Sequence, residues 1–302
     1  MNLVLIDNLT DALDVSLNGR SLFSYVYHSK ALREEGPKPY FHPLRTLGGE
    51  TVTLLRPHDH PWHCGLSMTC TSVSGDNFWG GYSWVAGHGY KRVPNYGIQR
   101  HLGWQSVQCE DDHIHIAENI AWESIRDEVV LAETREIEVF VPQPEADFWV
   151  LQLGFSLKNV SGRDLVFSSP TVEGRPMAGY GGLFWRGPRS FNDGVVLASD
   201  NRVGPELMSQ RSPWLAYVGR HDHSLAYSTV IIADRPNNVR YPTQWFVRNT
   251  PFACASAAFM FDEAYTLPAE ETLSLQYRVF IADGAWDTDR IENTLRLLHL
   301  NE

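Results

Sequence analysis

The most constraining feature of this sequence is a two-residue alternation of apolar and polar side chains, which recurs in short segments. The segment ETREIEVFV, residues 133–141, puts Ile137 and Val139 on one face and Glu138 on the other. This alternation is typical of a β-strand with one buried face. Comparable segments separated by Gly, Pro, Asn and Asp occupy residues 113–120, 150–157, 224–233, 255–261 and 273–282. The sequence therefore predicts an all-β fold, a large antiparallel β-sandwich.

Two local signals refine this architecture. The dipeptide Asn18-Gly19 separates two β-rich segments and predicts a tight hairpin. Residues 287–298, DTDRIENTLRLL, begin with acidic capping residues and carry one apolar stripe, which predicts a short C-terminal helix. Because no linker, repeat or low-complexity tract divides the chain, we expect a single domain over residues 1–302.

Charge and cysteine content exclude several classes of function. The chain has 25 Lys and Arg against 36 Asp and Glu, a net charge of -11, which disfavours nucleic acid and anionic membrane partners. No apolar run is long enough to span a bilayer, and the first residues lack the basic segment of a signal peptide. The four cysteines form no CxxC pair. We expect a cytoplasmic protein with a small-molecule partner, and a homo-oligomer is compatible with this composition.

The segment RPHDHPWHCGL, residues 56–66, concentrates titratable side chains. On an extended chain His58 and His60 point to one side and Asp59 to the other. Pro61 turns the chain, so that His63 can return toward the same cavity. Imidazole is well suited to proton transfer near neutral pH. The segment therefore predicts an acid–base site, with a polar turn as the simpler alternative.

Neighbouring residues extend this site and raise a second interpretation. His42 and Arg45 arrive from the preceding predicted strand. A metal site is the competing interpretation, because two histidines two residues apart with a third ligand can hold Zn, Fe or Mn. The glutamate that usually follows a His-x-His metal motif is missing here, and no HExxH occurs. We predict no cofactor and keep a divalent metal on His58, His60 and His63 as the alternative.

Three further segments combine aromatic side chains with polar or charged groups. Such mixtures can stack on the apolar faces of a sugar and fix it with a few hydrogen bonds. Glu173 could act as an acid or base in a semi-enclosed site, although a surface pair with Arg175 is the alternative. The segments are residues 74–84 with Asn77 and Trp79, residues 168–191 with Glu173, Trp185 and Arg186, and residues 237–253 with Trp245 and Arg248.

Taken together, these segments resemble the DUF6807 family, also called methane oxygenase PmoA-like, from about His28 to Ala285. The resemblance implies a galactose-mutarotase-like β-supersandwich and a role in carbohydrate metabolism. It also implies a histidine acid, His60 or His63, opposite a carboxylate base, Glu173. The motifs that carry the resemblance are KPYFHPLRT, PHDHPWHCGL, DNFWG, YGGLFWR, QWFVRNTPFA and LSLQYRVFIADG.

The leading hypothesis is an enzyme that acts on a sugar or sugar derivative by proton transfer, as a mutarotase, epimerase, lyase or hydrolase. A metal-dependent lyase or oxygenase and a non-catalytic carbohydrate-binding module are the alternatives. The predicted catalytic residues are His42, His58, His60, His63 and Glu173. The predicted substrate-binding residues are Arg45, Asp59, Trp62, Asn77, Trp79, Trp185, Arg186, Trp245 and Arg248.

Overall fold

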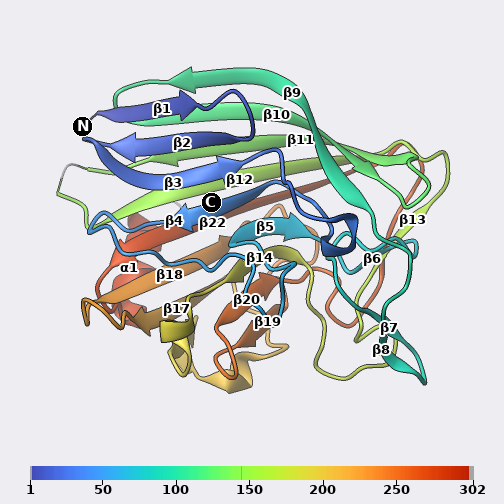
Figure 1. Ribbon diagram of the computed structural model, residues 1–302. Helices are drawn as coiled ribbons and strands as arrows, with labels where there is room; N and C mark the ends of the chain where they lie inside the picture. Colours follow the sequence, from blue (N-terminus) through green and yellow to red (C-terminus); the bar gives the residue numbers. More distant parts are fainter. Residues whose placement is uncertain (1, 144, 299–302) are drawn as a thin grey trace.

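The computed structural model describes residues 2–143 and 145–298 and confirms the all-β architecture (Figure 1). In this part of the chain the strands form two large sheets, a three-stranded sheet and a two-stranded ribbon. Neighbouring strands of both large sheets pair antiparallel, as the alternating segments predicted.

The first large sheet has eight strands among the described residues. Asn18 and Gly19 have φ values of 50° and 80°, as a tight hairpin turn requires, and they join its second and third strands. In spatial order the strands are β1 (Leu3–Asp7), β2 (Ala12–Leu17), β3 (Arg20–Val26), β4 (Tyr40–Leu44), β5 (Leu66–Thr69), β14 (Gly182–Arg186), β20 (Cys254–Ala257) and β19 (Trp245–Arg248).

The second large sheet has nine strands in the same described ranges. The strand predicted over residues 224–233 begins only at Tyr227, because Leu225 has a φ of 60° and belongs to a turn. The strand predicted over residues 255–261 is the shorter β20 of the eight-stranded sheet, since a turn begins at Ala258. In spatial order the strands are β16 (Arg202–Val203), β15 (Val195–Ala198), β17 (Trp214–Arg220), β18 (Tyr227–Asp234), β22 (Thr272–Asp283), β12 (Phe148–Asn159), β11 (Val129–Phe140), β10 (His113–Glu123) and β9 (Ile98–Cys109).

The remaining elements are short. The predicted C-terminal helix is α1 (Thr288–Leu297), which begins where Asp287 accepts a hydrogen bond from the backbone N–H of Arg290. Ile291 and Leu295 of α1 pack on the outer face of the nine-stranded sheet. The others are β21 (Tyr265–Leu267), β13 (Leu165–Ser168) and β6 (Ser72–Val73), the ribbon β7 (Ser83–Val85) and β8 (Gly89–Lys91), and the 3-10 turns η1 (Arg33–Glu35), η2 (Arg189–Phe191) and η3 (Pro205–Leu207).

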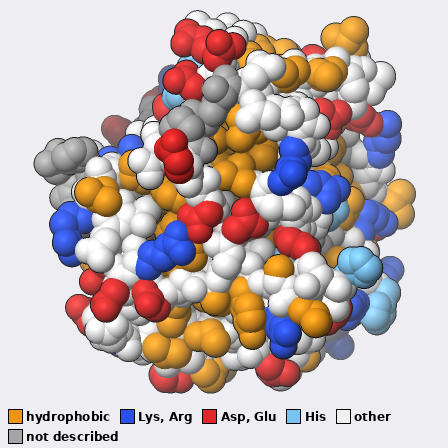
Figure 2. All heavy atoms as spheres, turned by 90° about the vertical axis from the view of Figure 1, so that its left-hand side faces the viewer, with side chains coloured by type: hydrophobic (Ala, Val, Ile, Leu, Met, Phe, Trp, Pro, Cys, Tyr) orange, Lys and Arg blue, Asp and Glu red, His pale blue; other side chains and the backbone are white. Residues whose placement is uncertain are grey.

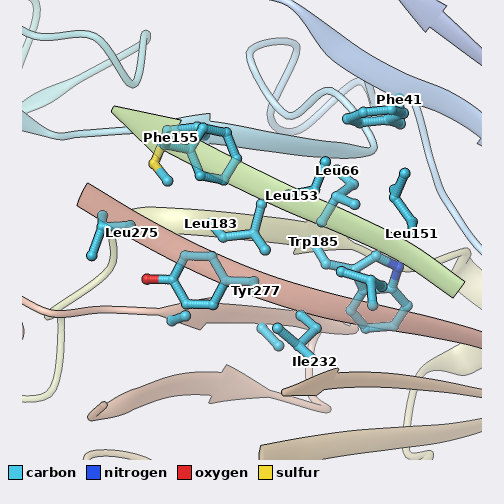
Figure 3. Close-up of a cluster of buried hydrophobic side chains, with 14 of the residues drawn as sticks. Phe41, Leu66, Leu151, Leu153, Phe155, Leu183, Trp185, Ile232, Leu275 and Tyr277 are labelled. Carbon is cyan, nitrogen blue, oxygen red and sulfur yellow. The ribbon is translucent and has the colours of Figure 1, made fainter. Parts of the chain in front are cut away.

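The main core lies between the two large sheets. Figure 3 shows Leu183 and Trp185 of β14 facing Leu153 of β12 and Tyr277 of β22. Because side chains alternate along a strand, the neighbouring Phe184 points to the opposite face of the eight-stranded sheet, where it joins a separate aromatic cluster. That outer face, covered by loops, carries the candidate site.

The surface and the thiols give few functional signals. Acidic and basic side chains lie interspersed on the face shown in Figure 2. Cys64, Cys70 and Cys254 are buried and Cys109 is exposed, all as free thiols. Within the described residues, no helix combines the length and the apolar character that crossing a membrane would require.

Candidate functional site

A cavity of about 350 Å³ lies on the outer face of the eight-stranded sheet, and we call it the histidine cavity. Three adjacent strands contribute to it: Phe184 on β14, Phe246 and Arg248 on β19, and Cys254 on β20. Eight of its fourteen lining residues are Phe, Tyr or Trp. Its size and its aromatic lining with a few polar groups suit a small organic ligand, for which pockets of about 300–1,000 Å³ are usual.

The pleat of the sheet decides which aromatic residues reach this cavity. Trp185 and Trp245 are buried in the main core, where their indole N–H groups donate to the carbonyls of Val52 and Ser212. The structure therefore does not bring these two predicted substrate-binding residues to the site. Their sequence neighbours Phe184 and Phe246 face the cavity instead.

Asp59 and His60 form a hydrogen-bonded pair at the cavity wall. His60 Nδ1 donates to Asp59 Oδ2 at 3.0 Å, and Arg189 donates to the other carboxylate oxygen at 3.1 Å. Burial raises the pKa of Asp59, but the hydrogen bond from His60 and the charge of Arg186 outweigh it and lower that pKa to about 2. An ionised carboxylate only accepts hydrogen bonds, so Nδ1 of His60 carries a proton. Burial lowers the pKa of His60, which leaves the ring neutral and Nε2 unprotonated at neutral pH.

His63 stacks on His60 with 4.6 Å between ring centroids and 24° between ring planes. Arg186 Nη1 donates to His63 Nδ1 at 3.4 Å. A guanidinium cannot accept a hydrogen bond, so Nδ1 of His63 is the bare nitrogen. Burial, followed by the neighbouring His60 ring and the charge of Arg186, holds the pKa of His63 well below its ordinary value. The neutral ring therefore carries its proton on Nε2, and the two stacked imidazoles are opposite tautomers.

The other predicted imidazoles lie outside the cavity. His58 Nδ1 accepts from Arg189 at 3.0 Å, and His58 does not line the cavity wall. His42 on β4 forms a hydrogen bond with Thr53 Oγ1, and burial lowers its pKa to about 4. Arg45 donates to Thr51 Oγ1 at 2.7 Å, away from the site. The structure thus brings together two of the four predicted histidines.

Glu173 lies in an adjoining cavity of about 140 Å³, which we call the glutamate cavity. Burial raises the pKa of Glu173, against the effect of a hydrogen bond from Ser168. Trp79, Tyr82 and Tyr180 line both cavities and so stand between Glu173 and the histidines. Glu173 is therefore a neighbour of the histidine site and does not line it.

Asn77 also lines the glutamate cavity, but its side chain forms hydrogen bonds within the local turn. Its side-chain oxygen accepts the backbone N–H groups of Trp79 and Gly80, each at 2.8 Å. Asn77 thereby fixes the turn that presents Trp79 to the histidine cavity.

Trp62 and Trp79, two of the predicted substrate-binding residues, line the histidine cavity. Gly81 has a φ of 69°, and a Cβ at this position would lie 2.5 Å from the Trp62 ring. Only glycine allows the turn to approach the indole so closely. The buried Lys38 donates to the carbonyl of Trp79 at 3.0 Å and fixes the other side of this turn.

Sequence reasoning missed a group of polar residues at the cavity. Arg175 donates to the hydroxyl of Tyr90, and its guanidinium lies 4.6 Å from the centroid of that ring. The Tyr90 hydroxyl is 2.8 Å from the Tyr180 hydroxyl. All three residues line the cavity, but Tyr90 lies on β8, whereas Arg175 and Tyr180 lie in the loop between β13 and β14. The predicted alternative, a pair between Arg175 and Glu173, is not formed among the described residues.

The histidines do not form the metal set that the sequence left open. Nδ1 of each of the three rings is hydrogen-bonded within the protein, His58 to Arg189, His60 to Asp59 and His63 to Arg186, which would leave Nε2 as the nitrogen available to a metal. Across residues 2–143 and 145–298, no three His, Cys, Asp or Glu side chains converge in a way that could hold a metal ion. The guanidinium groups beside the imidazoles also oppose a dication.

Comparisons with known proteins give the chain a family. Among solved structures it is similar to a galactose 1-epimerase from Lactobacillus acidophilus NCFM, with a TM-score of 0.42, 9% identity, and 94% of this chain and 99% of that chain covered. It is also similar to the GH36 alpha-galactosidase AgaA from Geobacillus stearothermophilus, with a TM-score of 0.37 and 12% identity, covering 94% of this chain and 40% of that chain. No curated protein matches the sequence. The model of DUF6807, a family of unknown function, matches residues 12–296, and the chain belongs to this family.

Proposed function

We propose that this protein is an enzyme that transfers protons on a sugar or sugar derivative bound in the histidine cavity. The observation that carries the proposal is the pair of stacked, neutral imidazoles in opposite tautomers. Nε2 of His60 is free to accept a proton, and Nε2 of His63 carries one to donate. A base and a hydrogen-bond donor thus stand side by side in an aromatic cavity.

The surrounding groups fix these two roles. Asp59 orients His60 through Nδ1 and stabilises the imidazolium that forms when Nε2 takes a proton. Arg186 keeps the proton of His63 on Nε2, where it can polarise a carbonyl or hemiacetal oxygen. Trp62 and Trp79 offer apolar faces to the ring of the sugar. Mutarotation, epimerisation, β-elimination and a related hydrolysis all need this combination.

In this proposal His60 takes the role of base that the sequence assigned to Glu173. Glu173 faces the glutamate cavity across Trp79, Tyr82 and Tyr180. Because Glu173 does not line the cavity that holds His60 and His63, we assign it no proton-transfer role there.

A second candidate function is carbohydrate binding without chemistry, which the aromatic lining of the histidine cavity favours. The two functions differ in one respect: stacking on a sugar does not require a neutral imidazole held by an ionised carboxylate. The Asp59–His60 pair therefore favours the enzyme.

The test is an NMR screen of sugars and keto-sugars with the wild-type protein and with His60→Gln, with the metal content of both samples measured. We expect one sugar class to be converted by the wild type and at least 100-fold more slowly by the variant. His113→Gln, at the half-buried start of β10 and outside the cavity, is the matched control and should keep wild-type turnover. Ligand binding without conversion by the wild type would favour the binding module. Conversion that depends on a stoichiometric metal would replace the proposal with the metal-dependent alternative.

A further inference from the structure

The charge of the histidine cavity is opposite to that of the whole protein. The chain carries a net charge of -11. The charged residues that line the cavity are one carboxylate, Asp59, and two guanidinium groups, Arg175 and Arg248. Asp59 is already paired with Arg189 and His60 and lies 3.7 Å from Nη2 of Arg186. Asp59 is therefore already paired with its own neighbours, and Arg175 and Arg248 have no carboxylate partner among the residues that line the cavity.

Arg248 is the clearest case. It lies on the cavity face of β19, is partly buried, and makes no side-chain hydrogen bond or ion pair with the residues described. Its guanidinium carbon lies 5.4 Å from the centroid of the Phe246 ring. A partly buried guanidinium has five N–H donors to satisfy, and it loses hydration without a counter-ion to compensate.

Arg175 and Arg186 add to the positive charge around the histidine cavity. Arg175 is held by the Tyr90 hydroxyl and lies over two aromatic rings, Tyr90 at 4.6 Å and Trp84 at 5.8 Å. Arg186 is buried directly behind His63 and Phe252, and its Nε and Nη2 make no hydrogen bond with the described residues. Three guanidinium groups thus surround one cavity that offers a single, already paired carboxylate.

We infer that the substrate of this cavity is an anionic sugar, whose carboxylate or phosphate group binds Arg248 and Arg175. The inference rests on the proposed function, because it takes the histidine cavity as the substrate site. A neutral sugar would leave both guanidinium groups without a counter-ion inside an aromatic enclosure. An anionic group would satisfy them with charge-assisted hydrogen bonds, and the fork of N–H donors on arginine matches the oxygens of a carboxylate or phosphate.

The experiment compares matched neutral and anionic probes by calorimetry and ligand-observed NMR. The neutral probes are D-glucose and D-galactose, the carboxylates are D-glucuronate, D-galacturonate and D-gluconate, and the phosphate is D-glucose 6-phosphate. We expect at least one anionic probe to bind the wild type about 10-fold or more tightly than its neutral counterpart. The carboxylate and phosphate arms identify which anion the site prefers.

Two variants connect the preference to the cavity. Arg248→Gln should weaken binding of the preferred anion by about 10- to 100-fold and change binding of neutral sugars less than about threefold. Arg248→Lys keeps the charge but loses the planar fork, so its affinity for the anion should lie between those of the wild type and Arg248→Gln. Arg126→Gln removes the same charge from an exposed turn between β10 and β11 and should leave every affinity unchanged.

The outcomes separate this inference from the proposed function. Conversion of a neutral sugar without preferential binding of any anionic probe would overturn the inference and leave the proposed function intact. Preferential binding of an anion that Arg248→Gln abolishes would support the inference, even if no probe were converted. Equal loss of affinity in Arg248→Gln and Arg126→Gln would show only a long-range field and would also overturn it.

Discussion

Two buried polar clusters on the two faces of the eight-stranded sheet differ in how completely their groups are satisfied. Between the two large sheets, Arg135 donates to Glu133 at 2.7 Å, to Tyr25 Oη at 3.1 Å and to Gln99 at 3.3 Å. Glu133 also accepts from the indole of Trp122. In the histidine cavity, by contrast, Arg248 and two nitrogens of Arg186 have no such partners among the described residues.

The interior cluster extends through a second carboxylate. The buried Glu118 accepts hydrogen bonds from the Tyr25 hydroxyl and from His101 Nδ1, the latter at 2.6 Å. Charges removed from water are tolerated when paired and hydrogen-bonded in this way. The interior cluster is therefore complete without a ligand and stabilises the fold, whereas we propose that a bound ligand completes the cavity cluster.

Breaking the interior cluster should have the largest effect. Arg135→Met leaves Glu133 buried without its counter-ion, and the free energy of unfolding should fall by about 3–5 kcal/mol. Urea denaturation measures this change. Arg248→Gln is the matched change in the cavity and should alter the stability by less than about 1 kcal/mol. Similar losses in both variants would remove the distinction between the clusters.

The next largest effect should be that of Asp59→Asn, and it should appear in the turnover rather than in the stability. An amide can donate to Nδ1 of His60, which moves the ring proton to Nε2 and removes the base. We expect kcat/KM to fall about 100-fold or more, equivalent to about 3 kcal/mol. Glu138→Gln, on the outer face of β11, serves as the control. A variant that retained full activity would show that the tautomer of His60 has no role.

His42 provides a histidine whose role is structural, and its effect should appear in the pH dependence of stability. Burial lowers its pKa from 6.5 to about 4 in the folded protein, so between these values the unfolded chain binds the extra proton. Stability should therefore decrease as the pH falls from 6.5 toward 4, by about 2 kcal/mol after allowance for the partial exposure of the ring. Thermal melts of the wild type should show this component between pH 6.5 and 4, and melts of His42→Asn should lack it. The same pH dependence in both proteins would mean that the ring titrates normally.

The smallest effect is expected for Glu173→Gln. Glu173 lines the glutamate cavity and not the histidine cavity. Its loss should therefore change kcat by less than about threefold, or about 0.6 kcal/mol. Steady-state kinetics on the sugar identified by the screen measure this change. A loss of 100-fold would restore Glu173 as the opposing base that the sequence suggested.

The sequence predicted the fold better than the site because the fold is encoded locally. The alternation in ETREIEVFV, the Asn18-Gly19 turn and the capped segment after Asp287 each specify one element without reference to distant residues. The Asp59, His60 and His63 cluster could likewise be predicted because its members lie within five residues of one another.

The rest of the site depends on information that the sequence carries only through the fold. Trp185 was predicted to bind the substrate, but the pleat of β14 places it in the main core and its neighbour Phe184 at the site. Arg175 could not be predicted because Tyr90, its hydrogen-bond partner, belongs to a separate two-stranded ribbon. The alternation of side chains along β14 and the long-range contact between Arg175 and Tyr90 therefore determine which residues reach the site.

The most direct test of the central claim is the ¹⁵N NMR spectrum of the histidine side chains at neutral pH, with His60 assigned by comparison with His60→Gln. The account predicts a neutral His60 ring with its proton on Nδ1 and a bare Nε2, and a His63 ring with the reverse arrangement. A His60 ring that is doubly protonated, or that carries its single proton on Nε2, would contradict the account.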